Sequence, residues 1–182
     1  GTLSNLNALV AARHNAGLGS DINSVVLVSE DAHSSFIKCI RIMGLSESNL
    51  IKIKTDNKGS MDIKNLIKIL NKCSLENKRI FAIVATLGTT VRGAIDPIKD
   101  ISKLCKKRNI WLHIDGSIGG IFAVTSLPIN DLNYINQANS ITINPQKIIG
   151  ITKTSSLLLV SNMRYLENTF STGLPYISSK EN

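Results

Sequence analysis

Aromatic residues are scarce in this sequence and make up only 4% of its 182 residues. Proteins that bind single-stranded nucleic acid commonly stack bases on aromatic side chains, so this scarcity argues against that class despite a formal net charge of +8. The lysines that produce the charge are scattered along the chain rather than gathered in one tract. We therefore interpret them as solvated helix faces, and we expect no nucleic-acid partner.

Long hydrophobic runs and a cysteine framework are also missing. No apolar run approaches the ~18–20 residues of a membrane-spanning helix, so we expect no membrane partner. The three cysteines, Cys39, Cys73 and Cys105, form no Cys-x-x-Cys pair and leave one odd residue. This pattern argues against a disulfide or zinc framework and favours a reducing, cytoplasmic location. We expect the cysteines to be small core residues.

The apolar residues, 43% of the chain, fall into short runs that alternate with helical patterns. Strands are predicted at Ser24–Ser29, Leu50–Ile53, Arg79–Thr86, Asn109–Ile114, Ser140–Ile143 and Thr154–Val160. Helices are predicted at Ser4–Ala16, His33–Met43, Asp62–Asn71 and from Asp96-Pro97 to Lys107. This alternation predicts an α/β domain with a mostly parallel sheet flanked by helices. Ligands of such sheets bind beyond the carboxyl ends of the strands.

Polar residues follow three of these predicted strands. The strand that ends at Thr86 leads into Gly88-Thr89-Thr90, the next into Asp115-Gly116-Ser117, and a third into Asn144-Pro145-Gln146-Lys147. The first helix begins near Gly1-Thr2, where free N–H groups suit an anionic group. A lysine can form a Schiff base and a carboxylate can pair with a pyridinium nitrogen. Together these features suit pyridoxal phosphate (PLP).

The sequence resembles the group II PLP-dependent amino acid decarboxylases. The matching segments are Gly1–Leu6 with Ala11–Arg13, Ser29–Ser35, Ala85–Thr90, Gly93–Pro97, Trp111–Asp115 and Asn144–Lys147, in the order of the family. The resemblance implies the fold type I PLP architecture, with residues 1–182 forming the large PLP-binding domain and with the family's N-terminal segment and small C-terminal domain absent. It also implies PLP as cofactor, an amino acid as substrate, and a homodimer with its active site at the subunit interface.

The resemblance implies catalytic roles for four residues. Lys147 matches the lysine that holds PLP as a Schiff base, and Asp115 matches the acid that pairs with the pyridine nitrogen. His33 matches the histidine that stacks over the cofactor ring. Tyr176 matches the mobile-loop tyrosine that delivers a proton to the substrate α-carbon.

Cofactor contacts are implied for further residues. Gly1, Thr2 and Asn144 match positions of the phosphate site. Thr90 matches a cofactor-contacting threonine of the Gly-Thr-Thr turn, and Ser117 is expected to lie under the ring.

Some positions depart from the family pattern or carry little signal. Gln146 stands before Lys147 where the family usually has histidine, and glutamine cannot carry a proton near neutral pH. Asp96 either orders the Gly-Thr-Thr turn or caps the helix that follows it. His14 and His113 carry no signal for function, and we expect His113 to pack within its strand.

These observations favour PLP-dependent decarboxylation of an L-amino acid to the amine and carbon dioxide. One alternative is another fold type I PLP enzyme, such as an aminotransferase, a desulfurase or an aldehyde-forming relative. A second is a non-catalytic PLP-fold module, which Gln146 and the missing flanks motivate. The substrate stays open, because Ala32–Ser35 resembles the aromatic branch of the family, whereas Gly93–Pro97 resembles the glutamate and diaminobutyrate branch.

Overall fold

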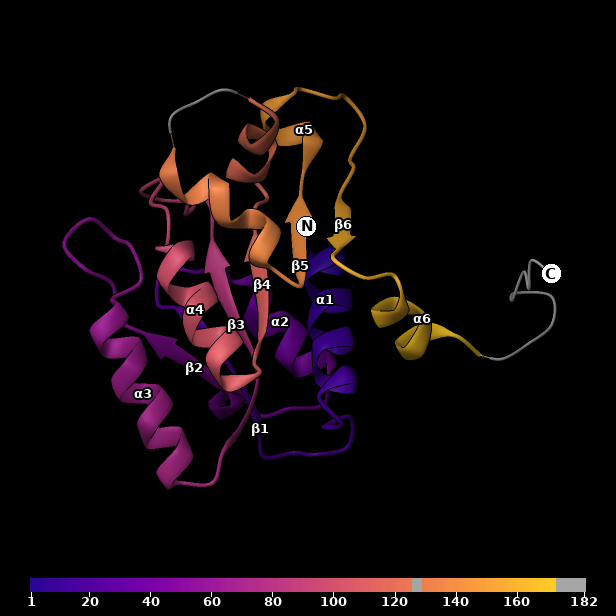
Figure 1. The fold of residues 1–182 in the computed structure, drawn as a ribbon. Helices are drawn as coiled ribbons and strands as arrows, with labels where there is room; N and C mark the ends of the chain where they lie inside the picture. The colour runs from indigo at the N-terminus through magenta and orange to yellow at the C-terminus, as the bar shows by residue number, and fades with distance from the viewer. Residues whose placement is uncertain (126–128, 173–182) are drawn as a thin grey trace.

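A six-stranded sheet forms the centre of the computed structural model, which describes residues 1–125 and 129–172 (Figure 1). The strand order is β2-β1-β3-β4-β5-β6; β1 to β5 run parallel, and β6 pairs antiparallel with β5. The strands are β1 (Ser24–Ser29), β2 (Leu50–Ile53), β3 (Arg79–Thr86), β4 (Trp111–Asp115), β5 (Ser140–Ile143) and β6 (Leu157–Val160). The predicted α/β class with a mostly parallel sheet is confirmed.

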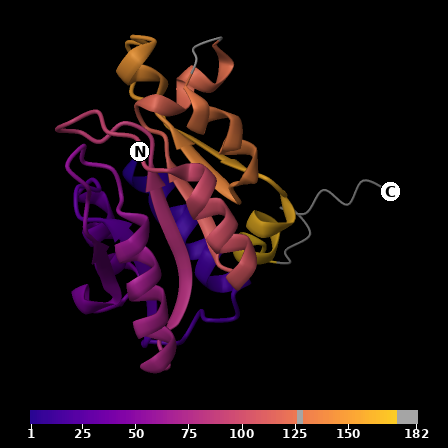
Figure 2. The ribbon, with the colours of Figure 1, turned by 60° about the vertical axis from the view of Figure 1, so that its left-hand side comes forward.

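Helices connect the strands. The α-helices are α1 (Thr2–Asn15), α2 (Ser35–Ile42), α3 (Ile63–Leu75), α4 (Ile98–Arg108), α5 (Pro145–Ile148) and α6 (Arg164–Phe170). The 3-10 helices are η1 (Glu47–Asn49), η2 (Gly119–Val124) and η3 (Asn130–Gln137). Figures 1 and 2 show α3 and α4 on one side of the sheet and α1 and α2 on the other.

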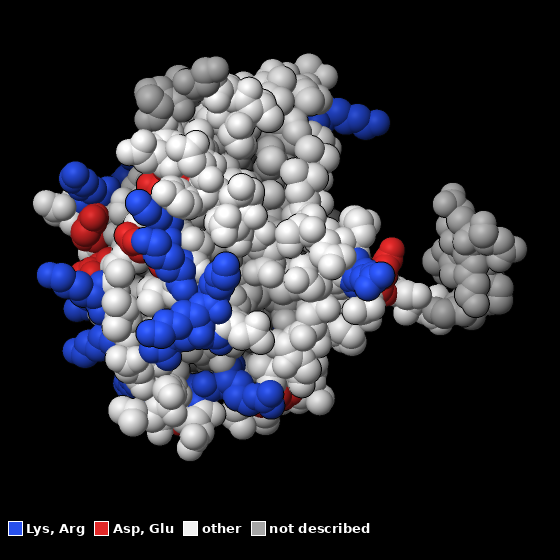
Figure 3. Space-filling model, viewed as in Figure 1, with Lys and Arg blue, Asp and Glu red and all other residues white. Residues whose placement is uncertain are grey.

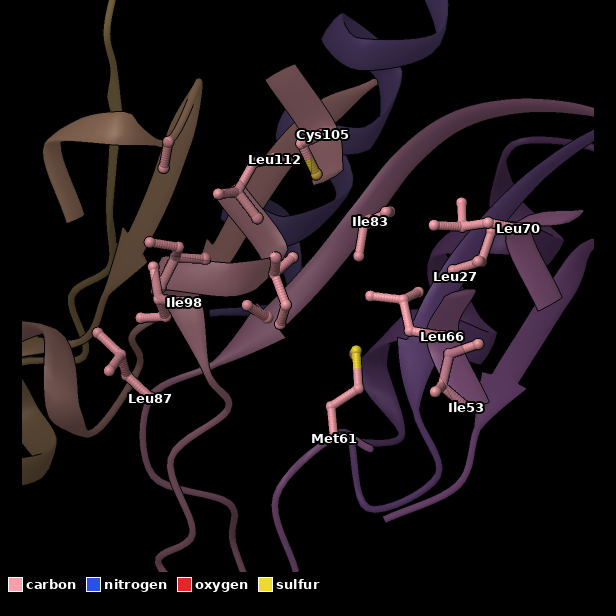
Figure 4. Close-up of a cluster of buried hydrophobic side chains, with 14 of the residues drawn as sticks. Leu27, Ile53, Met61, Leu66, Leu70, Ile83, Leu87, Ile98, Cys105 and Leu112 are labelled. Carbon is pink, nitrogen blue, oxygen red and sulfur yellow. The ribbon is translucent and has the colours of Figure 1, made fainter. Parts of the chain in front are cut away.

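The two faces of the sheet bury separate clusters because side chains alternate along each strand. On β1, Val25 and Leu27 pack toward α3 and α4, whereas Val26 and Val28 pack toward α1 and α2. Figure 4 shows the first cluster, in which Leu66 and Leu70 of α3 meet Leu27, Ile83 and Ile53. All three cysteines are free and buried, as predicted. The helices therefore cover the apolar sheet on both faces and leave its carboxyl end for polar groups.

Asp96 ties three segments together on the α3 and α4 side of the sheet. Its fully buried carboxylate accepts hydrogen bonds from the backbone N–H groups of Met61 at 2.7 Å and Thr86 at 2.8 Å. Burial raises the pKa of Asp96 to about 6, although both hydrogen bonds act in the opposite direction. The N-cap of α4 is Pro97. Of the two interpretations offered by the sequence, Asp96 therefore orders the turn after β3.

The connection between β4 and β5 carries no predicted helix or strand, whereas the structure forms η2 and η3 there. These short 3-10 helices lack the long i, i+4 periodicity of an α-helix. Gly119 begins η2, and its N–H donates to Leu87 O at 2.9 Å. A Cβ atom at Gly119 would lie 2.7 Å from the same oxygen, so only glycine allows this close approach. The helix α6 and the short helix α5 were also not predicted.

Basic side chains gather over α3 and α4 in the view of Figure 3. The lysines Lys64, Lys68, Lys103, Lys106 and Lys107 are all exposed, which agrees with the prediction of solvated helix faces. Within residues 1–125 and 129–172, no helix is both long and apolar enough to cross a membrane.

Replacing Asp96 by asparagine should lower the free energy of unfolding by about 1–3 kcal/mol, because an amide NH₂ would then face one of the two buried N–H donors. Urea denaturation followed by circular dichroism measures the change. The matched control is Asp100→Asn on the exposed start of α4, which should cost less than about 0.5 kcal/mol. Equal losses in the two variants would contradict the ordering role of Asp96.

Candidate active site

A cavity of about 180 Å³ lies at the carboxyl ends of β3, β4 and β5, beside the first turn of α1. It brings together all the predicted site residues that the structure describes, namely Gly1, Thr2, His33, Thr90, Asp115, Ser117, Asn144 and Lys147. Tyr176 lies outside the described residues. The sequence therefore predicts the location of the cavity, while the roles of its residues stay predictions.

Asp115 is the last residue of β4 and has only 4% of its surface exposed. In the sheet it is flanked by Thr86 of β3 and Thr142 of β5. Its Oδ1 accepts from the backbone N–H of Ser117 at 3.1 Å, and its Oδ2 accepts from Asn5 Nδ2 at 3.2 Å. These bonds fix the carboxylate against the floor of the cavity.

Lys147 reaches the same cavity from α5, which begins directly after β5. Asn144 is the N-cap of this helix and Pro145 occupies its first turn, a position where the missing N–H of proline is tolerated. No ion pair within the described residues involves Lys147. An amine and a carboxylate, 32 positions apart in the sequence, thus face one small cavity.

The wall formed by the start of α1 suits an anion. The first turn of this 14-residue helix carries no acidic residue, and its free N–H groups and dipole favour negative charge. The Asn144 amide lies 2.7 Å from Ser156 Oγ, which is itself 2.7 Å from Ser4 Oγ. A Cβ atom at Gly1 would lie 2.7 Å from Asn144 Nδ2, so a side chain there would displace the Asn144 amide.

His33 and Thr90 lie at the rim of the cavity, and both are exposed. His33 Nδ1 accepts from the backbone N–H of Ser35 at 3.1 Å, which orients the imidazole and leaves Nε2 free of this contact. The turn that carries Thr90 is closed by Thr89 Oγ1, which accepts from the backbone N–H of Ala94 at 3.0 Å. Gly88 enters this turn with a φ of 87°, a value that favours glycine.

The donor set of the cavity fits a ring with a basic nitrogen, an aldehyde and an anionic substituent. Asp115 can pair with a protonated ring nitrogen, Lys147 can react with an aldehyde, and the start of α1 can bind a phosphate. Thr86 is one of the lining residues, and its buried Oγ1 has no hydrogen-bond partner within the described residues. The described residues contain no cluster of histidine, cysteine and carboxylate side chains that could hold a metal ion.

Two residues outside the predicted set, Asn5 and His113, are linked to Asp115 by hydrogen bonds. His113 is fully buried within β4, as expected, but its Nε2 lies 3.1 Å from Asn5 Oδ1. Burial lowers the pKa of His113 to about 4, against the opposing attraction of Asp115. The spacing of two residues between His113 and Asp115 was the available signal, because residues i and i+2 of a strand share one face.

Gln146 lies beside the cavity rather than among its lining residues in the described part of the chain. Its Oε1 accepts a long hydrogen bond of 3.5 Å from Ser155 Oγ. The glutamine therefore braces the loop after α5 through a neutral contact.

The low pKa of His113 predicts an acid-dependent loss of stability. A histidine with a pKa near 6.5 when unfolded and about 4 when folded adds stability above pH 6.5, and this is lost as the pH falls toward 4. Between pH 7 and 4.5 the wild type should lose about 1–3 kcal/mol relative to His113→Gln in urea denaturation. His14→Gln, at an exposed histidine, is the control and should keep the wild-type pH dependence. Parallel curves for wild type and His113→Gln would refute the prediction.

Comparisons with known proteins identify the family. Residues 1–182 match the pyridoxal-dependent decarboxylase conserved domain. The chain is 31% identical to an aromatic-L-amino-acid decarboxylase of Bacillus atrophaeus and 32% identical to an acidic amino acid decarboxylase of Xenopus tropicalis; each alignment covers the whole chain but only 38% and 37% of the relative.

A solved structure agrees with these matches. It is the glutamate decarboxylase domain of the diaminobutyrate-pyruvate transaminase and L-2,4-diaminobutyrate decarboxylase from Vibrio parahaemolyticus, 28% identical with a TM-score of 0.86 over 93% of this chain and 39% of that one. The chain therefore spans less than half the length of the relatives it matches. It belongs to the pyridoxal-dependent decarboxylase family.

Proposed function

We propose that residues 1–182 form the large cofactor-binding domain of a PLP-dependent enzyme that decarboxylates an L-amino acid to the amine and carbon dioxide. The observation that carries the proposal is the shared cavity of Lys147 and Asp115, with the start of α1 as its anion-binding wall. Membership of the decarboxylase family supports the reaction type. When bound, PLP supplies an electron sink for the bond that breaks at the α-carbon.

The residues of the chain divide the remaining work. Lys147 Nζ would hold the cofactor covalently through its aldehyde. Asp115, fixed by Ser117 N–H and Asn5 Nδ2, holds a proton at the ring nitrogen. The N–H groups of the first turn of α1, with Thr2 and Asn144, bind the phosphate.

Three further residues cover the ring and complete the reaction. His33, oriented through Nδ1, and Ser117 line the cavity and would pack on the cofactor ring. Thr90 would contact the cofactor from the Gly-Thr-Thr turn. Tyr176 delivers the proton that replaces the lost carboxylate.

The proposal includes a homodimer that acts in the cytoplasm. Several apolar side chains near α5, β6 and α6 are exposed, which supports the packing of a second protein surface against this region. They are Ile148, Ile149, Ile151, Leu157, Leu159, Met163 and Phe170. Three buried, unpaired cysteines suit a reducing compartment. The relatives act, by their names, on aromatic and on acidic amino acids, so the substrate class proposed here is an L-amino acid without further restriction.

Lys147→Ala should abolish the visible absorbance of bound PLP after gel filtration and lower carbon dioxide release by at least ~100-fold, because the covalent hold is lost. The matched control is Lys153→Ala, at an exposed lysine six positions further along the chain, which should keep both signals. A Lys147→Ala protein that retained the visible band would contradict the assignment.

The products separate this function from its alternatives. A panel of L-amino acids is incubated with the PLP-loaded protein, and carbon dioxide, amine, aldehyde and keto acid are each measured. Carbon dioxide with an equal amount of amine supports decarboxylation, whereas keto acid or aldehyde indicates another PLP reaction. PLP binding without turnover of any amino acid would support the non-catalytic module that Gln146 motivates.

A further inference from the structure

A chain of buried side chains runs between α1 and the sheet and ends on Asp115. Trp111 Nε1 lies 2.8 Å from Ser140 Oγ, and the same oxygen lies 2.8 Å from His113 Nδ1. His113 Nε2 lies 3.1 Å from Asn5 Oδ1, and Asn5 Nδ2 donates to Asp115 Oδ2 at 3.2 Å. Four consecutive hydrogen bonds thus connect an indole in the core to the carboxylate in the cavity.

The two ends of this chain determine its direction. Trp111 can only donate through its indole N–H, and the Asp115 carboxylate can only accept. Because Asn5 Nδ2 donates to Asp115, Asn5 Oδ1 faces His113 Nε2, and this nitrogen must carry a hydrogen. In the neutral imidazole Nδ1 is then bare, so Ser140 Oγ donates to Nδ1 while it accepts from Trp111.

The opposite arrangement leaves like groups facing each other. If the hydrogen were on His113 Nδ1, the bare Nε2 would face the oxygen of Asn5. Rotating the Asn5 amide by half a turn would relieve the contact with His113 but would place two acceptors together at the other end, because the amide oxygen would then face Asp115 Oδ2. One tautomer of His113 and one orientation of Asn5 satisfy every group in the chain.

All members of the chain are buried. Asn5, His113, Ser140 and Asp115 expose between 0 and 4% of their surfaces, and Trp111 exposes 8%. A buried polar network is more costly to leave half satisfied than to replace by apolar groups. Because each member of this chain is paired, the orientation of each side chain is fixed by its neighbours.

We propose that His113, Ser140 and Asn5 are positioning residues that hold the Asp115 carboxylate in one orientation, with Asn5 Nδ2 on Oδ2 and the remaining lone pairs directed to the ring nitrogen of the cofactor. This inference rests on the proposed function. None of the three residues needs to take part in proton transfer, because the chain acts by fixing where the carboxylate points.

The His113 tautomer is the first test, and it does not need the cofactor. The full-length protein is labelled with ¹⁵N-histidine, freed of PLP and examined by NMR between pH 6 and 8; the His113 signals are those missing from His113→Gln. Bare Nδ1 and protonated Nε2 are expected. A hydrogen on Nδ1, or an imidazolium, would overturn the proposed direction of the chain.

PLP affinity and absorbance provide the second test. His113→Gln keeps a side-chain N–H that can reach Asn5 Oδ1, so its dissociation constant for PLP should stay within about threefold of the wild-type value. His113→Leu removes the contact and should weaken PLP binding about tenfold, with a shifted visible band. Simple packing predicts the reverse order, because leucine suits a dry core better than glutamine.

Phe36→Leu is the matched control, because Phe36 packs edge-on against the His113 ring at 6.4 Å and has no polar link to Asp115. It should lower the melting temperature and leave the dissociation constant within about twofold. Equal PLP affinity of His113→Leu and His113→Gln would overturn the proposal. If the wild type binds no PLP at all, the proposed function fails instead, and the NMR result still reports on the hydrogen-bond chain.

Discussion

The hydrogen bond from Asn5 to Asp115 joins the two halves of the candidate site. Asn5 belongs to the first turns of α1, and Asp115 ends the central strand β4, 110 positions later. This contact and the apolar packing of α1 on the sheet place the start of α1 and the carboxylate at the same cavity. Lys147, His33 and Thr90 line the same cavity as Asn5 and Asp115.

The sheet topology explains why the polar groups converge. Parallel strands place their carboxyl ends at one edge, so the turns after β3, β4 and β5 meet there. Two local constraints then shape these turns. The buried Asp96 carboxylate holds the turn after β3, and Gly119 lets the segment after β4 approach Leu87 closely. One buried carboxylate and one close backbone approach therefore shape the turns that surround the cavity.

Sequence reasoning recovers the elements whose pattern is local. The bounds of β1, β2, β3 and β5 agree with the predicted runs, because buried parallel strands are continuous apolar segments. The helix start at Asp62 was also predicted, because Asp is a favoured N-cap residue. In the structure its carboxylate accepts hydrogen bonds from the N–H groups of Lys64 and Asn65. Family motifs indicated which polar residues would gather. In contrast, the contact between Asn5 and His113 became visible only in the structure, because it joins segments about a hundred residues apart.

The long sequence separation within the cavity affects how the domain folds. Contacts between distant segments form only after the chain has lost much of its conformational freedom, so the site is completed when the sheet closes against α1. A partly folded chain has no such cavity, and any ligand held there favours the closed form over all looser ones. At a ligand concentration one hundred times its dissociation constant, this linkage adds about 2.7 kcal/mol to stability. Ligand binding in the cavity and folding of the domain are therefore thermodynamically linked.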